Sequence, residues 1–310
     1  MRKNFLILVL GLFLSPLIGA ETVHLLAVGD TGKNGPPQKQ VAEAMLRHCQ
    51  IYPCQYGLLL GDNLYNEGMK TPNDPKMDEV FKNYYSRLPI PFFVTLGNHD
   101  YGALSNNWTR GSYQLGYSKS NPQFMLPNYW YYVEFENFVL AVIDTTRMMW
   151  SKDLDLQRQM LQEAHNKSKG KFFIVMGHHP YLSNGSHGNA GRYEGVSRPS
   201  FVSGTEVKKM IDQEVCGKAH LYLSGHDHSL QLASGAQAGC STLLVVSGAG
   251  GDSDGLEKRN STIFEAQSLG FVTLAVDATQ ISLKFWNQDN QLLYQGRTES
   301  PLKFRRSRRR

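Results

Sequence analysis

Five short clusters in this sequence combine glycine with side chains that bind metal ions. Carboxylate oxygens and imidazole nitrogens are common ligands of metal ions in proteins, and glycine lets the backbone turn tightly and approach an ion closely. Every cluster directly follows a run of apolar residues. In chain order the clusters are Gly29-Asp30-Thr31-Gly32, Gly61-Asp62-Asn63-Leu64-Tyr65, Gly97-Asn98-His99-Asp100, Gly177-His178-His179-Pro180 and Ser224-Gly225-His226-Asp227-His228.

Each cluster alone is a weak indication of a site, because a run such as Gly-Asp-Thr-Gly is most often a turn. The combination is stronger. Side chains two residues apart in extended chain point to the same side, which groups His226 with His228. Six of the ten histidines lie in or just after the clusters, namely 99, 178, 179, 187, 226 and 228. This concentration favours a metal or catalytic site over five unrelated turns.

The elements that must position these clusters are buried strands alternating with helices. Pro37 is typical of a helix start, and Ser203 with Glu206 predicts a capping box before a helix over 207–215. A hairpin is expected to join 129–135 to 138–143 through a two-residue turn. The other predicted strands are 23–28, 57–60, 92–95, 172–176, 221–223, 242–246, 271–276, 281–286 and 292–295.

The alternation of strands and helices predicts one α/β domain over residues 21–300. A composition of 41% hydrophobic and 19% charged residues suits a packed globular protein. In α/β sheets, ligands bind in the crevice outside the carboxyl ends of the strands. All five clusters follow predicted strands, so we expect them to meet at one such edge.

Residues 1–20 have the layout of a secretory signal peptide. Arg2 and Lys3 precede an apolar run over 5–14, and Gly19-Ala20 offers small residues for cleavage. The run is shorter than the roughly 20 residues needed to span a bilayer. A retained membrane anchor is the alternative. We expect export, to the periplasm or the cell exterior.

The formal net charge of +5 is concentrated at the two ends of the chain. Two basic residues lie in the predicted signal and six among the last eight residues, and without these eight charges the net charge is −3. Residues 301–310 therefore predict a disordered basic tail. Such a tail makes loose contact with an anionic membrane or polyanion, and does not indicate specific recognition of nucleic acid.

Four cysteines in an exported chain allow two disulfides and three pairings. Pairing Cys49 with Cys54 and Cys216 with Cys240 keeps both loops local, and we favour this connectivity.

The order Gly-Asp, Gly-Asp-x-x-Tyr, Gly-Asn-His-Asp, Gly-His and Gly-His-x-His resembles the calcineurin-like metallophosphoesterase family. Most members of that family carry Asp-x-His in the first motif. Here Gly32 stands in the histidine's place, and Tyr65 follows Asp62 by three residues. That exchange resembles the purple acid phosphatase subgroup, and the chain length resembles its small tartrate-resistant type. The resemblance implies an α/β fold, a four-layer sandwich of two mixed β-sheets flanked by helices.

The resemblance also implies two metal ions. Asp30, Tyr65 and His228 would bind the first metal, Asn98, His178 and His226 the second, and Asp62 would bridge both. Because a free phenol has a pKa of about 10, a tyrosinate ligand points to Fe(III) at the first position. Imidazole and amide oxygen suit a divalent Fe, Zn or Mn ion at the second. His99 would lie near the phosphate and His187 would contact the substrate, while His179 receives no role.

The implied activity is acid hydrolysis of phosphate monoesters, with a metal-bound hydroxide as nucleophile. The substrate would be a small phosphomonoester or a phosphoprotein, bound by a monomer, with segments 101–128 and 188–201 forming the rim. A phosphodiesterase or nucleotidase of the same fold is the first alternative, and Gly32 with Tyr65 argues against it. A non-catalytic phosphate-binding protein is the second alternative.

Overall fold

The computed structural model describes residues 21–103 and 106–298. The predicted export signal at 1–20 and the predicted basic tail at 301–310 lie outside the described residues. Within the described part of the chain, no helix is long and apolar enough to cross a membrane.

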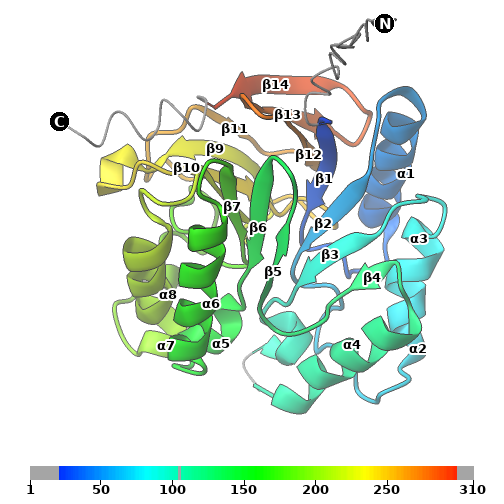
Figure 1. Cartoon of the computed structure of the whole chain (residues 1–310). Helices are drawn as coiled ribbons and strands as arrows, with labels where there is room; N and C mark the ends of the chain where they lie inside the picture. The colour runs from blue at the N-terminus through cyan, green and yellow to red at the C-terminus, as the bar shows by residue number, and fades with distance from the viewer. Residues whose placement is uncertain (1–20, 104–105, 299–310) are drawn as a thin grey trace, which may run out of the picture.

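The described residues form two seven-stranded mixed β-sheets (Figure 1). In the first sheet, β1, β2, β3 and β4 are parallel neighbours, and β12, β13 and β14 continue it in antiparallel order beyond β1. The strands of this sheet are β1 (Val23–Val28), β2 (Tyr56–Leu60), β3 (Phe92–Thr95), β4 (Phe124–Met125), β12 (Gly270–Val276), β13 (Ile281–Asn287) and β14 (Leu292–Arg297).

The second sheet has the order β11-β9-β10-β8-β7-β6-β5. Its four central strands are parallel, and β5, β9 and β11 are antiparallel to their neighbours. The strands are β5 (Tyr131–Glu134), β6 (Phe138–Val142), β7 (Phe172–Met176), β8 (Leu221–Ser224), β9 (Leu230–Ser234), β10 (Leu243–Ser247) and β11 (Phe264–Ala266).

The two sheets share one apolar core, and alternation along the strands decides which side chains enter it. On β6, Leu140 and Val142 join the core shared with the first sheet, whereas Val139 and Ala141 join a second core under the helices of the second sheet. Figure 1 shows α1 and α3 beside the first sheet and α6 and α8 on the outer side of the second. This is the predicted four-layer sandwich of two mixed sheets flanked by helices.

The helices on the first-sheet side are α1 (Pro36–Ile51), α2 (Pro75–Met77), α3 (Asn83–Tyr85) and α4 (Trp108–Ser120), with a π-helical segment at Asp78–Lys82. Those beside the second sheet are α5 (Thr145–Met149), α6 (Leu154–Lys167), α7 (Ser200–Ser203) and α8 (Thr205–Met210), followed by a π-helical segment at Ile211–Val215. Helix α1 begins at Pro36-Pro37 as expected, since its first turn needs no backbone donor there.

The capping box predicted at Ser203 and Glu206 is wrong. Gly204, with φ of 71°, separates α7 from α8, so Ser203 ends one helix rather than capping the next. The Ser203 hydroxyl bonds Thr205 Oγ1, and Glu206 pairs with Lys209. Helices commonly end at a glycine in the left-handed region, and Gly204 occupies that position after α7.

The predicted disulfide pairing is confirmed. Cys49 is bonded to Cys54 beside the end of α1, and Cys216 is bonded to Cys240. Both bonds close short loops and fit an extracellular protein.

Candidate metal centre

The carboxyl ends of five parallel strands bring the five clusters together, as the sequence predicts. Strands β1, β2 and β3 deliver Asp30, Asp62 and Asn98 from the first sheet. Strands β7 and β8 deliver His178 and His226 from the second. The site therefore lies where both sheets end, and both sheets contribute to it.

One group of side chains is formed by Asp30, Tyr65 and His228. The Tyr65 hydroxyl donates to Asp30 Oδ1 over 3.0 Å and lies 3.3 Å from His228 Nε2. His228 Nε2 is 3.7 Å from the same Asp30 oxygen. These three residues are the set that the family resemblance assigns to the first metal.

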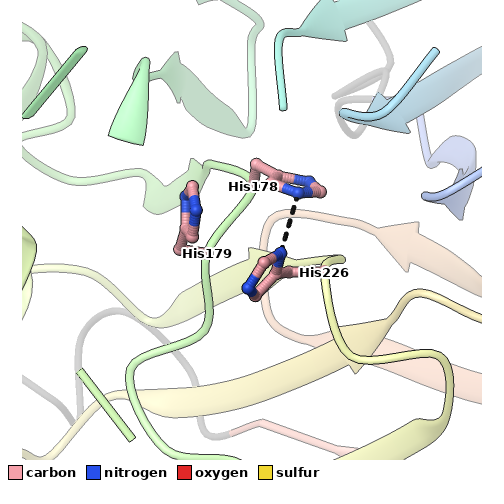
Figure 2. Close-up of side chains that lie close together, drawn as sticks. All are labelled: His178, His179 and His226. Atoms are coloured by element: carbon pink, nitrogen blue, oxygen red, sulfur yellow. Dashed lines mark hydrogen bonds between the residues drawn. The ribbon is translucent and has the colours of Figure 1, made fainter. Parts of the chain in front are cut away.

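A second group is formed by Asn98, His178 and His226. His178 Nε2 lies 3.0 Å from Asn98 Oδ1 and 3.2 Å from His226 Nδ1, the contact drawn in Figure 2. Asp62 Oδ2 is 3.5 Å from His178 Nε2, and Asp30, Asp62 and His178 lie close enough together to share an ion. Asp62 thus lies beside both groups, at the place expected of a bridging ligand.

The spacing of these donor atoms fits metal binding. Ligand atoms about 2.1 Å from a common ion lie roughly 3 to 3.5 Å apart, and the distances given above for the two groups, 3.0 to 3.7 Å, are close to this spacing. The backbone supports the same interpretation, because Asp30, Asp62 and His226 have φ of 58°, 53° and 69°. Residues other than glycine rarely adopt this left-handed conformation, and such strain concentrates at functional sites.

Glycine is required at two positions that precede predicted ligands. A Cβ at Gly97 would lie 2.1 Å from Asp62 Oδ1, and a Cβ at Gly61 would lie 2.6 Å from His178 Nδ1. Gly61 also has φ of 91°. These glycines let backbone approach the site where any side chain would displace a predicted ligand.

Asp100 joins two of the ligand loops. It is fully buried, and its carboxylate accepts from the backbone N–H groups of Asn63, Leu64 and Gly97. Burial and the nearby Asp62 raise the pKa of Asp100 to about 6. The last residue of Gly-Asn-His-Asp is therefore the structural link between the loop after β2 and the loop after β3.

The electrostatics of the site favour a bound cation. Burial and the neighbouring Asp62 raise the pKa of Asp30 well above its ordinary value, against the opposing charge of His178. Burial would also lower the pKa of His178, but Asp62 and Asp30 outweigh it and raise that pKa to about 10. Positive charge beside two buried carboxylates stabilises them; the protonated His178 supplies it here, and a metal ion would supply it when bound.

The pKa of Tyr65 indicates which kind of cation its phenolate oxygen could bind. Burial, Asp30 and Asp62 all raise the pKa of its phenol well above 10, so the hydroxyl keeps its proton and donates to Asp30. A strongly acidic cation is needed to displace this proton.

His99 and His187 flank the two groups. The backbone N–H of His99 donates to Asp62 Oδ1 over 2.9 Å, and the ring Nδ1 of His99 lies 2.6 Å from the carbonyl oxygen of Asn66. The ring of His187 lies against that of His226, with centroids 4.1 Å apart, and its Nδ1 contacts Glu194. Sequence reasoning missed Glu194, since nothing in its local sequence marks it.

Asp254 is a second residue that sequence reasoning missed. Its Oδ2 lies 2.9 Å from Nδ1 of His228, the ring nitrogen opposite the one that faces Tyr65. Lys33 pairs over 2.6 Å with Asp252, two residues earlier. The signal available for this segment is the run Ser247-Gly248-Ala249-Gly250, which resembles the final active-site loop of the family.

His179 lies beside His178 and His226 and is buried (Figure 2). Thr145 Oγ1 accepts the backbone N–H groups of both His178 and His179, and lies 2.8 Å from Nδ1 of His179. With both acceptor positions filled, the hydroxyl donates to Nδ1, and the proton of a neutral His179 is then on Nε2. Burial lowers the pKa of this histidine well below 6.5, which keeps it neutral.

A cavity of about 530 Å³ opens beside these residues. Asn98, His99, His187 and His226 form its polar side, and the two expected rim segments contribute Ala103, Asn106, Tyr193, Glu194 and Phe201.

This sandwich of two sheets, with a histidine- and carboxylate-rich site at the strand ends, defines a metallophosphoesterase. The chain belongs to the calcineurin-like phosphoesterase family, whose model matches residues 23–230.

Similar proteins indicate which subgroup of this family the chain resembles. The chain is 26% identical over 311 residues to Purple acid phosphatase 4 of Arabidopsis thaliana, covering 91% of this chain and 85% of that protein. It is 28% identical over 242 residues to Tartrate-resistant acid phosphatase type 5 of Rattus norvegicus, covering 68% of each. The resemblance to purple acid phosphatases is thus confirmed, and these relatives support hydrolysis of phosphoesters.

Solved structures agree on the fold. One described as GAP50, the anchor in the inner membrane complex of Plasmodium, superposes with a TM-score of 0.70 at 19% identity, covering 90% of this chain and 89% of that one. PhoD superposes with a TM-score of 0.60 at 11% identity.

Proposed function

We propose that this protein is an acid phosphatase that hydrolyses phosphate monoesters with two metal ions. The observation that carries the proposal is the convergence of six side chains into two groups of three donors, with Asp62 beside both groups. Family membership and the acid phosphatase relatives support the same reaction class.

Asp30, Tyr65 and His228 would hold Fe(III), because the raised pKa of Tyr65 requires a strongly acidic ion for a tyrosinate to form. Asn98, His178 and His226 would hold a divalent Fe, Zn or Mn ion. When bound, two such cations neutralise the charge of phosphate and lower the pKa of water, so that hydroxide is available at acidic pH.

The residues of the chain supply binding and proton handling. Hydrolysis breaks the bond between phosphorus and the alcohol oxygen, places a water oxygen on phosphorus, and leaves the alcohol in need of a proton. His187 borders the cavity beside His226 and is oriented by Glu194 at Nδ1. It would deliver that proton through its other ring nitrogen, while His99 would contact the phosphate.

A specific observation favours monoesters over diesters. The Asp-x-His form of the diesterase relatives needs a side chain at position 32, yet a Cβ at Gly32 would lie 2.4 Å from the backbone of Asn63 and Leu64. No histidine fits at that position without moving the loop that carries Tyr65.

Turnover of p-nitrophenyl phosphate beside its bis-ester, from acidic to neutral pH, tests the proposal. We expect fast monoester turnover at acidic pH with little diester cleavage. Preferred diester cleavage near neutrality would move the function to phosphodiesterases. If metal-loaded protein hydrolyses neither ester, a non-catalytic phosphate-binding protein is favoured. A protein of this fold that is described as an anchor is in keeping with that alternative.

We further propose that the chain acts as an exported monomer on a small phosphomonoester or a phosphoprotein. The two disulfides support export.

A further inference from the structure

The cavity beside the metal centre has two chemically different sides. One side is polar and is formed by predicted metal ligands and by His99 and His187. The other side is apolar and is formed by Met149, Trp150, Phe201 and Val202. A volume of about 530 Å³ lies within the range of small-molecule sites. Nothing in the two-metal chemistry requires the apolar side.

The apolar side is built on a well-fixed element. Helix α5 begins at Thr145, and the fully buried Asp144 before it caps the helix by accepting from the backbone N–H of Arg147. The Arg147 guanidinium pairs with Asp153 and lies over the rings of Trp108 and Tyr129. Trp150 directly follows this anchored turn, so its place in the cavity wall is held by packing.

Two aromatic rings from different helices meet in this wall. Trp150, at the end of α5, stacks on Phe201 of α7 with centroids 4.3 Å apart and ring planes 21° apart. Both rings are half-buried rather than sealed into the core. A stacked pair left partly accessible beside a catalytic site offers a ring face and edge to another aromatic group.

The charges along the cavity disfavour a second anionic group on the substrate. None of the residues described along its wall is Lys or Arg, and Glu194 contributes a carboxylate. A nucleoside polyphosphate or a sugar bisphosphate would place negative charge there without a partner, which is costly in a partly dehydrated site. An uncharged apolar group meets no such penalty.

We propose that this pocket binds an aromatic ring in the alcohol part of the ester. The phosphate occupies the polar side, so the organic group must extend toward Trp150 and Phe201. The substrates would then be monoesters of aromatic alcohols or phenols, preferred over small polar esters such as glycerol phosphate. This inference rests on the proposed phosphatase function, because it assigns the substrate class of that site.

The first experiment compares kcat/KM for benzyl phosphate and glycerol phosphate, since both release an alcohol and differ mainly in the ring. The native protein should prefer benzyl phosphate. Trp150→Ala and Phe201→Ala should each reduce kcat/KM for benzyl phosphate about tenfold, on the scale of a lost apolar contact in a substrate pocket, and change glycerol phosphate less than about twofold. Trp150→Phe should retain most of the preference.

Phe264→Ala is the matched control. Phe264 is half-buried and stacks on Tyr294 with centroids 5.1 Å apart, but it does not line this cavity. It should leave the preference unchanged. Equal losses on both substrates in Trp150→Ala and Phe201→Ala would show a structural role and overturn the inference, as would equal turnover of both esters by the native protein.

A binding measurement separates this inference from the proposed function. Metal-loaded protein is titrated with benzylphosphonate and with methylphosphonate, neither of which is hydrolysed. Tighter binding of the benzyl compound that disappears in Trp150→Ala supports the pocket even if no ester is turned over, in which case only the phosphatase proposal fails. Equal binding of both phosphonates overturns the pocket, whatever the turnover.

Discussion

The backbone N–H of Tyr65 donates to the carbonyl oxygen of Gly32 over 2.9 Å. Gly32 in turn donates its own N–H to the carbonyl oxygen of Asp62 over 3.1 Å. Gly32 and Tyr65, the two positions at which this sequence differs from the Asp-x-His pattern, are thus joined directly by backbone hydrogen bonding. The missing side chain at position 32 leaves room for the loop that brings the Tyr65 phenol to Asp30.

Gly32→Ala should therefore destabilise the fold and displace Tyr65. The new Cβ would lie 2.4 Å from backbone atoms of Asn63 and Leu64, and backbone cannot move aside cheaply. We expect a loss of about 2–3 kcal/mol, on the scale of overpacking, seen as a lower Tm together with weaker metal retention. Gly116→Ala is the control, since Gly116 is an exposed position of α4 with open space around its Cβ. It should be neutral or stabilising by up to about 1 kcal/mol. An unchanged Tm in Gly32→Ala would refute the close contact.

Asp254→Asn should weaken metal binding without unfolding the protein. The carboxylate lies 2.9 Å from His228 Nδ1, while Nε2 of the same ring faces Asp30 and Tyr65, and the negative charge of the carboxylate makes the imidazole a stronger ligand. Loss of such a partner typically costs 10–100-fold in metal affinity, so we expect about tenfold or more by competition with a chelator. Asp252→Asn, which removes the ion pair with Lys33 in the same loop, is the matched control with a smaller expected effect. Equal effects of the two variants would contradict the assignment.

His187→Ala should retain both metals and lose turnover, mainly for esters with poor leaving groups. A proton donor matters most when the departing alkoxide is strongly basic, and its removal costs about 10²–10⁴-fold. The measurement is kcat for an alkyl phosphate beside p-nitrophenyl phosphate, with metal content determined on the same samples. Unchanged turnover of the alkyl ester would show that the assigned role is wrong.

Asp144→Asn should make stability less dependent on pH. Burial raises the pKa of Asp144 to about 7, against the hydrogen bonds from Tyr101 and Arg147. Between the unfolded pKa of about 3.9 and this value, the folded protein holds a proton that the unfolded chain has lost. The contribution of Asp144 to the free energy of unfolding therefore falls as pH rises from about 4 to 7, by at most about 1.4 kcal/mol per pH unit.

The test is the Tm difference between Asp144→Asn and the native protein at several pH values. The Tm of the variant minus the Tm of the native protein should rise steadily from pH 4 to pH 7 and change little above pH 7. A difference that is flat with pH would mean that Asp144 is ionised throughout. The expected behaviour suits a protein that works in acidic surroundings.

Much of the fold and most of the candidate site follow from local sequence patterns. Apolar runs with a glycine and a ligand-type residue at their ends mark both a buried strand and its carboxyl edge, which is why the sequence could place Asp30, Asn98 and His178 at strand ends. The predicted strand 23–28 ends at the observed last residue, because residues 25–28 are all buried and form an apolar run that stops at Gly29-Asp30.

The residues that sequence reasoning missed depend on how irregular loops fold. Asp254 meets His228 from a separate loop, and Glu194 meets His187 because the irregular chain between them folds back over seven residues. Trp150 and Phe201 come from short helices that carry no periodic signal. The incorrect capping box at Ser203 has a local cause, because Gly204 and its left-handed backbone outweigh a four-residue pattern.

The most direct test of the two-metal account is metal content and monoester turnover measured together on native protein, Asp62→Asn and Tyr65→Phe. The account predicts two metals per native chain, one of them iron, with a visible absorption band from tyrosinate that Tyr65→Phe removes. Asp62→Asn should lose metal and turnover together, by more than about a hundredfold in rate, because it removes a ligand rather than an outer partner. Full metal content and turnover in Asp62→Asn would contradict the account, and so would two metals in a native protein that hydrolyses no phosphomonoester.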